Sequence, residues 1–156
     1  MTKTNAARLL DKQKIAYELV SYEVDETDLS ATAVANKLGQ NIKQVFKTLV
    51  VRGDKTGIFV AVIPGDDELD LKTAAKISGN KSATMIAVKE ILNLTGYIRG
   101  GCSPLGMKKQ YPTFIDKSCL TFEYIFVSAG VRGTQIKLSP NDLIRAVGAI
   151  PFDGTN

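Results

Sequence analysis

A glycine-rich segment at residues 96–106 contains the residue types best suited to binding chemistry in this sequence. It reads GYIRGGCSPLG and places four glycines and one proline in eleven positions. Glycine tolerates positive φ and allows close approach to the backbone, so successive N–H groups in such a loop can converge on an anion or a carbonyl oxygen. The segment therefore predicts an anion- or oxyanion-binding loop, with a tight connecting loop as the alternative.

Lys47 is the cation with the most unusual setting. It stands within the string QVFKTLV, flanked by apolar residues, where a short helical turn is expected to become a strand. A charge at such a position must reach a cleft or the surface. Two interpretations stay open: a lysine of a functional site, or a lysine whose stem packs against the protein while its ammonium stays in water.

Carboxylates and a second loop supply further candidates. Asp116, Asp70 and the pair at 66–67 stand near the ends of expected elements, where they could act as a general base for water or serve as caps and turns. The string SAGVRG at 128–133 follows an expected strand directly, which is a common place for binding residues. A simple turn is the alternative for that string.

The sequence contains no histidine, which removes several classes of catalytic site. Ser-His-Asp and Cys-His nucleophilic catalysis and HExxH zinc sites all require an imidazole. Cys102 and Cys119 are the two cysteines, and they do not form a CxxC pair. We therefore expect free thiols in a reducing compartment, with no metal site and no cofactor.

Periodicity and capping signals predict the elements that must position these residues. Helices are expected at 5–14, at 31–38 between Ser30 and Gly39, at 71–77 after Asp70, at 87–94 and at 140–147. Strands are expected at 17–24, 47–51, 58–63, 112–116 and 124–128. The turn at 53–57 should join two of them in a central hairpin whose second strand, almost wholly apolar, is buried on both faces.

Composition is that of an ordinary folded domain. The chain has 156 residues, 44% of them hydrophobic and 23% charged, with a net charge of +4 that would attract a polyanion without marking a strong nucleic-acid binder. It lacks an apolar run of ~18 residues, so we expect no membrane span and a cytoplasmic protein. The irregular alternation of helices and strands predicts one mixed α/β domain over 1–156, with a mixed or largely antiparallel sheet surrounded by helices.

Four motifs, taken together, resemble the YbaK/EbsC family in that family's order and spacing. They are FKTL at 46–49, LDLK at 69–72, GYxxGGxSPLG at 96–106 and VSxGxRG at 127–133, so the resemblance covers nearly the whole chain. The GGxSPLG string is the most specific. The family is related to the editing domain of bacterial prolyl-tRNA synthetases. The resemblance implies a YbaK-like fold and a trans-editing deacylase that hydrolyses mischarged Cys-tRNA(Pro). Because the modest net charge indicates weak discrimination between tRNAs, we expect prolyl-tRNA synthetase as a further partner.

The resemblance also implies roles for individual residues. Lys47 matches the lysine needed for activity, Tyr22 a tyrosine of the site wall, Gly100 a loop glycine and Ser128 a serine near the substrate. Two further residues of the loop, Gly101 and Ser103, are also expected to contact the substrate. Two positions depart from the family pattern: Cys102 replaces an apolar residue, and Gln135 replaces an aspartate.

The mechanism implied by the family suits a protein without histidine, because the thiol of the substrate attacks its own ester carbonyl. Loop N–H groups would stabilise the oxyanion, and Lys47 would lie near the ester or the terminal phosphate. Three alternatives stay open: Cys102 as a protein nucleophile, a non-catalytic module that binds tRNA or a synthetase, and a deacylase for another small amino acid such as alanine.

Overall fold

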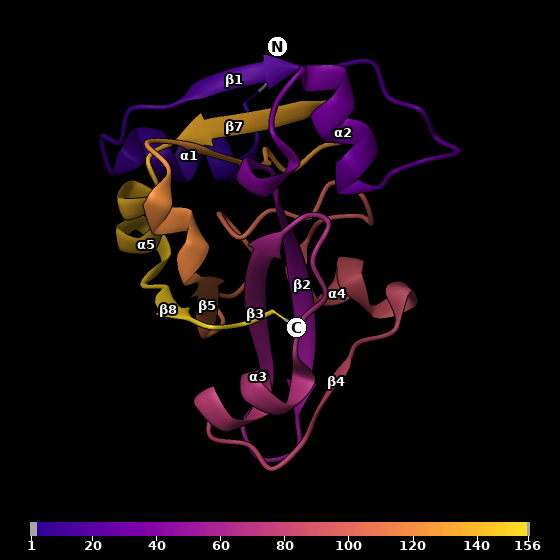
Figure 1. Ribbon diagram of the computed structural model, residues 1–156, viewed down its shortest axis with the longest axis vertical. Coiled ribbons are helices and arrows are strands. Elements are labelled where there is room, and N and C mark those ends of the chain that lie inside the picture. Colours follow the sequence, from indigo (N-terminus) through magenta and orange to yellow (C-terminus); the bar gives the residue numbers. More distant parts are fainter. Residues whose placement is uncertain (1–2, 156) are drawn as a thin grey trace.

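The computed structural model describes residues 3–155 as two β-sheets with helices packed around them (Figure 1). The α-helices are α1 Asn5–Lys12, α2 Ala31–Leu38, α3 Leu71–Ile77, α4 Ile91–Thr95 and α5 Pro140–Val147, with short 3-10 turns η1 Ile42–Gln44, η2 Val88–Glu90 and η3 Lys117–Thr121. The strands are β1 Glu18–Ser21, β2 Phe46–Gly53, β3 Gly57–Pro64, β4 Ala83–Met85, β5 Thr113–Asp116, β6 Ile125–Ser128, β7 Thr134–Leu138 and β8 Ile150–Phe152.

The larger sheet is mixed and the smaller one is antiparallel. The five-stranded sheet has the order β4-β2-β3-β5-β8, in which β5 runs parallel to β3 and β8 and the other pairs are antiparallel. The three-stranded sheet has the order β1-β7-β6. The predicted mixed α/β class is confirmed. The expectation of a single sheet is wrong, because β7 was not predicted and its pairing with β1 and β6 creates a second sheet.

The central hairpin forms as predicted. Strands β2 and β3 pair in register from Phe46 opposite Pro64 to Gly53 opposite Gly57. The side chains of Val60–Ile63 are all buried, so this strand lies between two packed faces. The hairpin is the long axis of the molecule in Figure 1, with the smaller sheet lying across its upper end.

Capping residues fix most helix ends. The Ser30 hydroxyl accepts a hydrogen bond from the Ala33 N–H at 3.2 Å, and Gly39 closes α2 in the left-handed conformation at φ +66°. Asp70 caps α3 in the same way. The helix predicted at 87–94 is wrong in its first half, because Glu90 folds back to accept a hydrogen bond from the Ala87 N–H and forms a 3-10 turn before α4.

The two sheets meet where β2 begins and β6 ends. Val45 and Phe126 form an isolated parallel bridge between them. The main core cluster contains buried residues of both sheets, among them Phe46 and Val62 of the larger and Val127 and Ile136 of the smaller. The start of β2, the end of β6 and the start of β7 are therefore held side by side, and this junction bears the candidate site.

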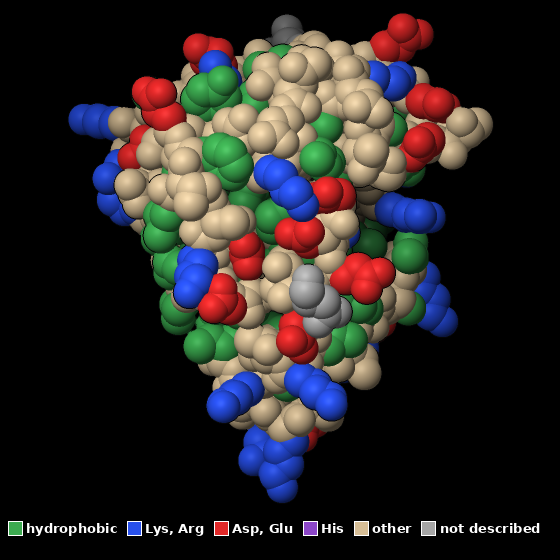
Figure 2. All heavy atoms as spheres, in the orientation of Figure 1, with side chains coloured by type: hydrophobic (Ala, Val, Ile, Leu, Met, Phe, Trp, Pro, Cys, Tyr) green, Lys and Arg blue, Asp and Glu red, His purple; other side chains and the backbone are tan. Residues whose placement is uncertain are grey.

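Neither acidic nor basic side chains dominate the face of the molecule drawn in Figure 2. Acidic and basic side chains alternate over the middle of this face, and basic side chains gather at the narrow end below α3. Between residues 3 and 155, no helix has the length and apolar character needed to cross a membrane.

Candidate active site at the junction of the two sheets

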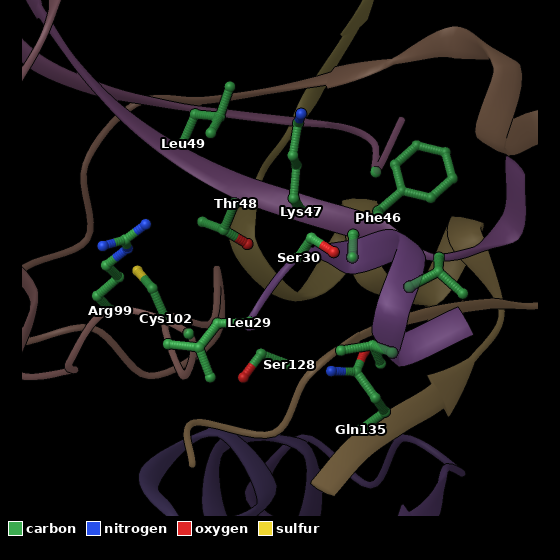
Figure 3. Close-up of a pocket in the computed structure, with 15 residues that line it drawn as sticks. Leu29, Ser30, Phe46, Lys47, Thr48, Leu49, Arg99, Cys102, Ser128 and Gln135 are labelled. Atoms are coloured by element: carbon green, nitrogen blue, oxygen red, sulfur yellow. The ribbon is translucent and has the colours of Figure 1, made fainter. Parts of the chain in front are cut away.

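A cavity of about 390 Å³ opens at this junction, within the size range of small-molecule sites. Three parts of the fold contribute its wall: the start of α2, strand β2 and the glycine-rich loop, closed from below by β6 and β7 (Figure 3). The lining residues are Leu29, Ser30, Ala31, Val34, Val45, Phe46, Lys47, Thr48, Leu49, Gly65, Arg99, Gly100, Cys102, Ser128 and Gln135.

Three of the six predicted site residues line this cavity. They are Lys47, Gly100 and Ser128, which come from segments more than 25 residues apart in the sequence. Ser128 ends β6, and its register partner on β7 is Gln135, so these two polar residues enter the cavity wall side by side. The structure brings together the motifs at 46–49, 96–106 and 127–133.

The other three predicted residues lie behind the wall. Tyr22 lines a smaller neighbouring cavity that shares Leu29 and Gly100 with the main one. Gly101 is buried against the backbone of Val131, which would lie 3.2 Å from an added Cβ. Ser103 has no exposed surface, and its hydroxyl accepts a hydrogen bond from the Leu105 N–H at 3.2 Å.

Gly101 and Ser103 therefore lie outside the cavity lining, and the serine hydroxyl is used within the SPLG turn. That both contact the substrate stays a prediction.

The glycine-rich loop is held at both ends. The Tyr97 hydroxyl donates to the Leu105 carbonyl at 2.7 Å and closes the base of the loop. At its tip, the Arg132 Nε–H donates to the Arg99 carbonyl at 2.9 Å. Gly100 has φ +83°, and a Cβ there would lie 3.1 Å from Arg132 Nε, so the tip needs glycine for its conformation and its packing. The loop is an ordered wall of the cavity.

Lys47 is half-buried on β2, opposite Ile63 of β3. Within residues 3–155 its ammonium forms no ion pair with a carboxylate. Figure 3 shows its side chain leaving β2 on the side opposite to Thr48. This lysine is therefore available to a negatively charged ligand.

Two buried oxygens of the wall have no hydrogen-bond partner in the described part of the chain. They are Thr48 Oγ1 and Gln135 Oε1, and only 5% of the Gln135 surface is exposed. Leaving a buried acceptor unpaired costs about 1–3 kcal/mol, so such groups normally have a partner. Both residues line the cavity, where a bound ligand can supply the missing hydrogen bond. Gln135 is buried because β7 pairs with β6. Since β7 was not predicted, the sequence alone could not assign a role to Gln135.

The thiol of Cys102 lies in the cavity wall beside Leu29 and Arg99 (Figure 3). Burial raises the pKa of this thiol to about 11, and a hydrogen bond with Thr95 opposes only part of that rise. A raised pKa favours the neutral thiol, so this environment disfavours Cys102 as a nucleophile.

The carboxylates considered as general bases are used elsewhere. Asp70 caps α3, and Asp116 accepts hydrogen bonds from the N–H groups of Ser118 and Gly154. Asp66 and Asp67 form ion pairs with Lys43. Their interpretation as caps and turns is confirmed, and none of the residues that line the cavity is acidic.

Comparisons with known proteins agree with the motifs. A model of the aminoacyl-tRNA editing domain matches residues 26–146. EbsC of Enterococcus faecalis, named as a candidate Cys-tRNA(Pro)/Cys-tRNA(Cys) deacylase, is 50% identical over 142 residues, which cover 91% of this chain and 87% of that protein. The proline–tRNA ligase of Fervidobacterium nodosum is 32% identical over 79 residues, which cover 51% of this chain and 14% of the ligase.

A solved structure supports the same fold. It is described as a candidate trans-editing enzyme for prolyl-tRNA synthetase and superposes with a TM-score of 0.86 at 23% identity, covering 100% of this chain and 99% of that one. The family model spans most of the chain and EbsC aligns over nearly all of it, which confirms the resemblance inferred from the four motifs. The chain belongs to the aminoacyl-tRNA editing domain family.

Proposed function

We propose that this protein is a trans-editing deacylase that clears cysteine from mischarged Cys-tRNA(Pro). The observation that carries the proposal is the chemistry of the cavity wall. The lining residues include two cations and several hydroxyl and amide groups, but no carboxylate, and the sequence has no histidine. Such a wall can bind the phosphates next to an aminoacyl ester and stabilise an oxyanion, but it offers no general base for water.

A substrate that brings its own nucleophile fits this wall. The sulfur of the cysteinyl group attacks the ester carbonyl carbon, a C–S bond forms and the C–O bond to the ribose breaks. The 3′ oxygen leaves with the proton that the thiol gave up, and the thiolactone is then opened by water to give free cysteine. A free thiol has a pKa of about 8.5, so a few per cent is ionised near neutrality without help from the protein.

The protein's task in this reaction is to position the reacting groups. The protein holds the sulfur at reacting distance from the carbonyl carbon, so the two groups need not meet by diffusion. This orientation supplies most of the acceleration available to an intramolecular reaction. Backbone N–H groups at the Gly100 tip are the donors proposed for the oxyanion. We assign to Lys47 the binding of the negative charge near the ester. Ser128, Thr48 and Gln135 are assigned contacts with the aminoacyl group.

The proposed partner for tRNA selection is prolyl-tRNA synthetase. The mixed surface of Figure 2 and the net charge of +4 favour weak, unselective attraction of tRNA by the isolated chain. A tRNA(Pro)-specific footprint by this chain alone would contradict that assignment. Because charged tRNA is made in the cytoplasm, the proposed activity belongs there.

Replacing Cys102 by serine should leave deacylation within about twofold of wild type. Its thiol, with a pKa of about 11, is protonated at neutral pH and is not needed as a nucleophile when the substrate supplies one. Initial rates on Cys-tRNA(Pro) measure this. A loss of a hundredfold or more in the serine variant, with unchanged thermal stability, would transfer the nucleophilic role to the protein.

The proposed function itself is tested by release of labelled amino acid from purified tRNA. Wild-type protein should clear Cys-tRNA(Pro) and leave Pro-tRNA(Pro) intact over the same time. Protein that binds Cys-tRNA(Pro) without releasing cysteine would instead be a binding module.

A further inference from the structure

Arg99 is a cavity residue to which neither the motifs nor the comparisons assign a role. It lies at the tip of the glycine-rich loop, is exposed, and lines the cavity together with Gly100 and Cys102. Figure 3 shows its guanidinium projecting from the loop on the side of the cavity nearest Thr48. It is one of two cations in the wall, the other being Lys47.

The backbone of Arg99 is fixed while its side chain is free. The Arg132 Nε–H donates to the Arg99 carbonyl, and the Gly101 N–H donates to the Ile98 carbonyl at 2.9 Å, so the turn is held on both sides of the residue. The Arg132 guanidinium is itself neutralised by Glu26 at 2.6 Å. In the part of the chain from 3 to 155, the Arg99 guanidinium has neither a hydrogen bond nor an ion pair with any side chain.

The charges around Arg99 select the kind of ligand. The lining of the main cavity is free of carboxylates, and Glu26 is engaged by Arg132. Asp25 and Asp28 line the smaller neighbouring cavity on the other side of Gly100, where their carboxylates accept hydrogen bonds from their own loop. A planar guanidinium with several N–H donors matches the oxygens of a phosphate, to which it can donate two parallel hydrogen bonds. An exposed, unpaired arginine at the mouth of a cavity without acids therefore favours a phosphate group lying just outside the reacting ester.

From this geometry we infer that Arg99 binds the phosphate on the 5′ oxygen of the terminal adenosine of the tRNA, and so seats the 3′ end of the substrate. The inference rests on the proposed function, because it places the aminoacyl ester of that adenosine in the cavity. Lys47 and Arg99 then have separate tasks: Lys47 acts next to the ester, and Arg99 anchors the nearest phosphate.

Two small esters isolate this contact. One is the 3′-cysteinyl ester of adenosine, and the other is the 3′-cysteinyl ester of adenosine 5′-monophosphate, which differs only by the phosphate. Wild type should hydrolyse the phosphorylated ester with about tenfold higher kcat/KM, as expected for one charge-assisted contact at a partly exposed site. Arg99→Gln should lose this preference, so that its kcat/KM values for the two esters become equal, and Arg99→Lys should keep part of it.

A matched charge control is Arg145→Gln, which removes one arginine from an exposed position on α5 outside the cavity lining. It should retain the tenfold preference. If Arg99→Gln retains the preference as well, the inference is wrong while the deacylase function stands. If wild type releases cysteine from neither the esters nor Cys-tRNA(Pro), the proposed function fails together with the inference.

Salt dependence on the whole tRNA gives a second, independent readout. Each phosphate contact to a single strand contributes about 0.7 to the slope of log affinity against log salt. The slope of log KM for Cys-tRNA(Pro) should therefore fall by about 0.7 in Arg99→Gln and remain unchanged in Arg145→Gln. Equal slopes in wild type and Arg99→Gln would overturn the assignment.

Discussion

Replacing Lys47 by alanine should lower kcat/KM for deacylation of Cys-tRNA(Pro) by about 10²–10³-fold, the range measured when one preorganised electrostatic contact to a transition state is removed. Lys47 is half-buried in the cavity wall and its ammonium forms no ion pair within the described chain, so no carboxylate of the protein neutralises its charge. Single-turnover rates with excess enzyme measure the chemical step directly.

A matched control separates charge in the cavity from charge on the protein. Lys55 is exposed in the turn between β2 and β3, on the same hairpin as Lys47 but outside the cavity lining. Lys55→Ala should be fully active, and both variants should unfold at temperatures close to that of wild type. A Lys47→Ala variant that stays within twofold of wild type would remove the lysine from the mechanism.

The second large effect concerns the substrate. Wild type should clear Cys-tRNA(Pro) at least ~10³-fold faster than Ala-tRNA(Pro) or Ser-tRNA(Pro), because neither of these amino acids carries a thiol that can attack its own ester. Packing differences between such similar side chains supply only about 10–200-fold discrimination. The loss of an intramolecular nucleophile is a larger effect, since effective molarities reach 10⁵–10⁸ M.

The selectivity ratio also decides between the proposed deacylase and its nearest alternative. Equal rates on alanine and cysteine esters would indicate a water-based reaction and a general deacylase for small amino acids. Rates measured at saturating enzyme exclude differences in tRNA binding from the comparison.

Local chemistry predicted much of this fold. Ser30 and Asp70 were assigned as N-caps because a short polar side chain can accept the free N–H groups of a first helical turn, and both do so. The run at 58–63 was predicted to be a strand buried on both faces because it has almost no polar residue, and the structure confirms it. These features depend on neighbours in sequence.

The smaller sheet was missed because β7, which connects its other two strands, was not predicted. Its pairing with β6 is a local hairpin, whereas its pairing with β1 joins segments far apart in the sequence. Strand β7 has five residues and follows a loop, and what stabilises it is its position between β1 and β6. The two strands β4 and β8 have three residues each and exist as partners of longer strands. Such short segments contain too little hydrophobic alternation to be predicted as strands from the sequence alone.

The same distinction applies to the site. Lys47, Gly100 and Ser128 belong to motifs whose residue types are visible in the sequence, and all three line the cavity. Gln135 reaches the wall only because β7 pairs it with Ser128. Arg99 lies within the glycine-rich string, but the sequence could not show that it lines a cavity whose own lining contains no carboxylate, because that lining comes from distant segments.

The central claim is that the substrate's thiol performs the attack, and masking that thiol tests it most directly. We would compare single-turnover hydrolysis of Cys-tRNA(Pro) with that of the same tRNA carrying S-methylcysteine, which keeps the sulfur but removes its acidic proton and its capacity to form the thiolactone. The proposed mechanism predicts rapid release of cysteine and release of S-methylcysteine at the uncatalysed rate. Comparable release of both amino acids by wild-type protein would contradict it and would require a nucleophile supplied by the protein or by water.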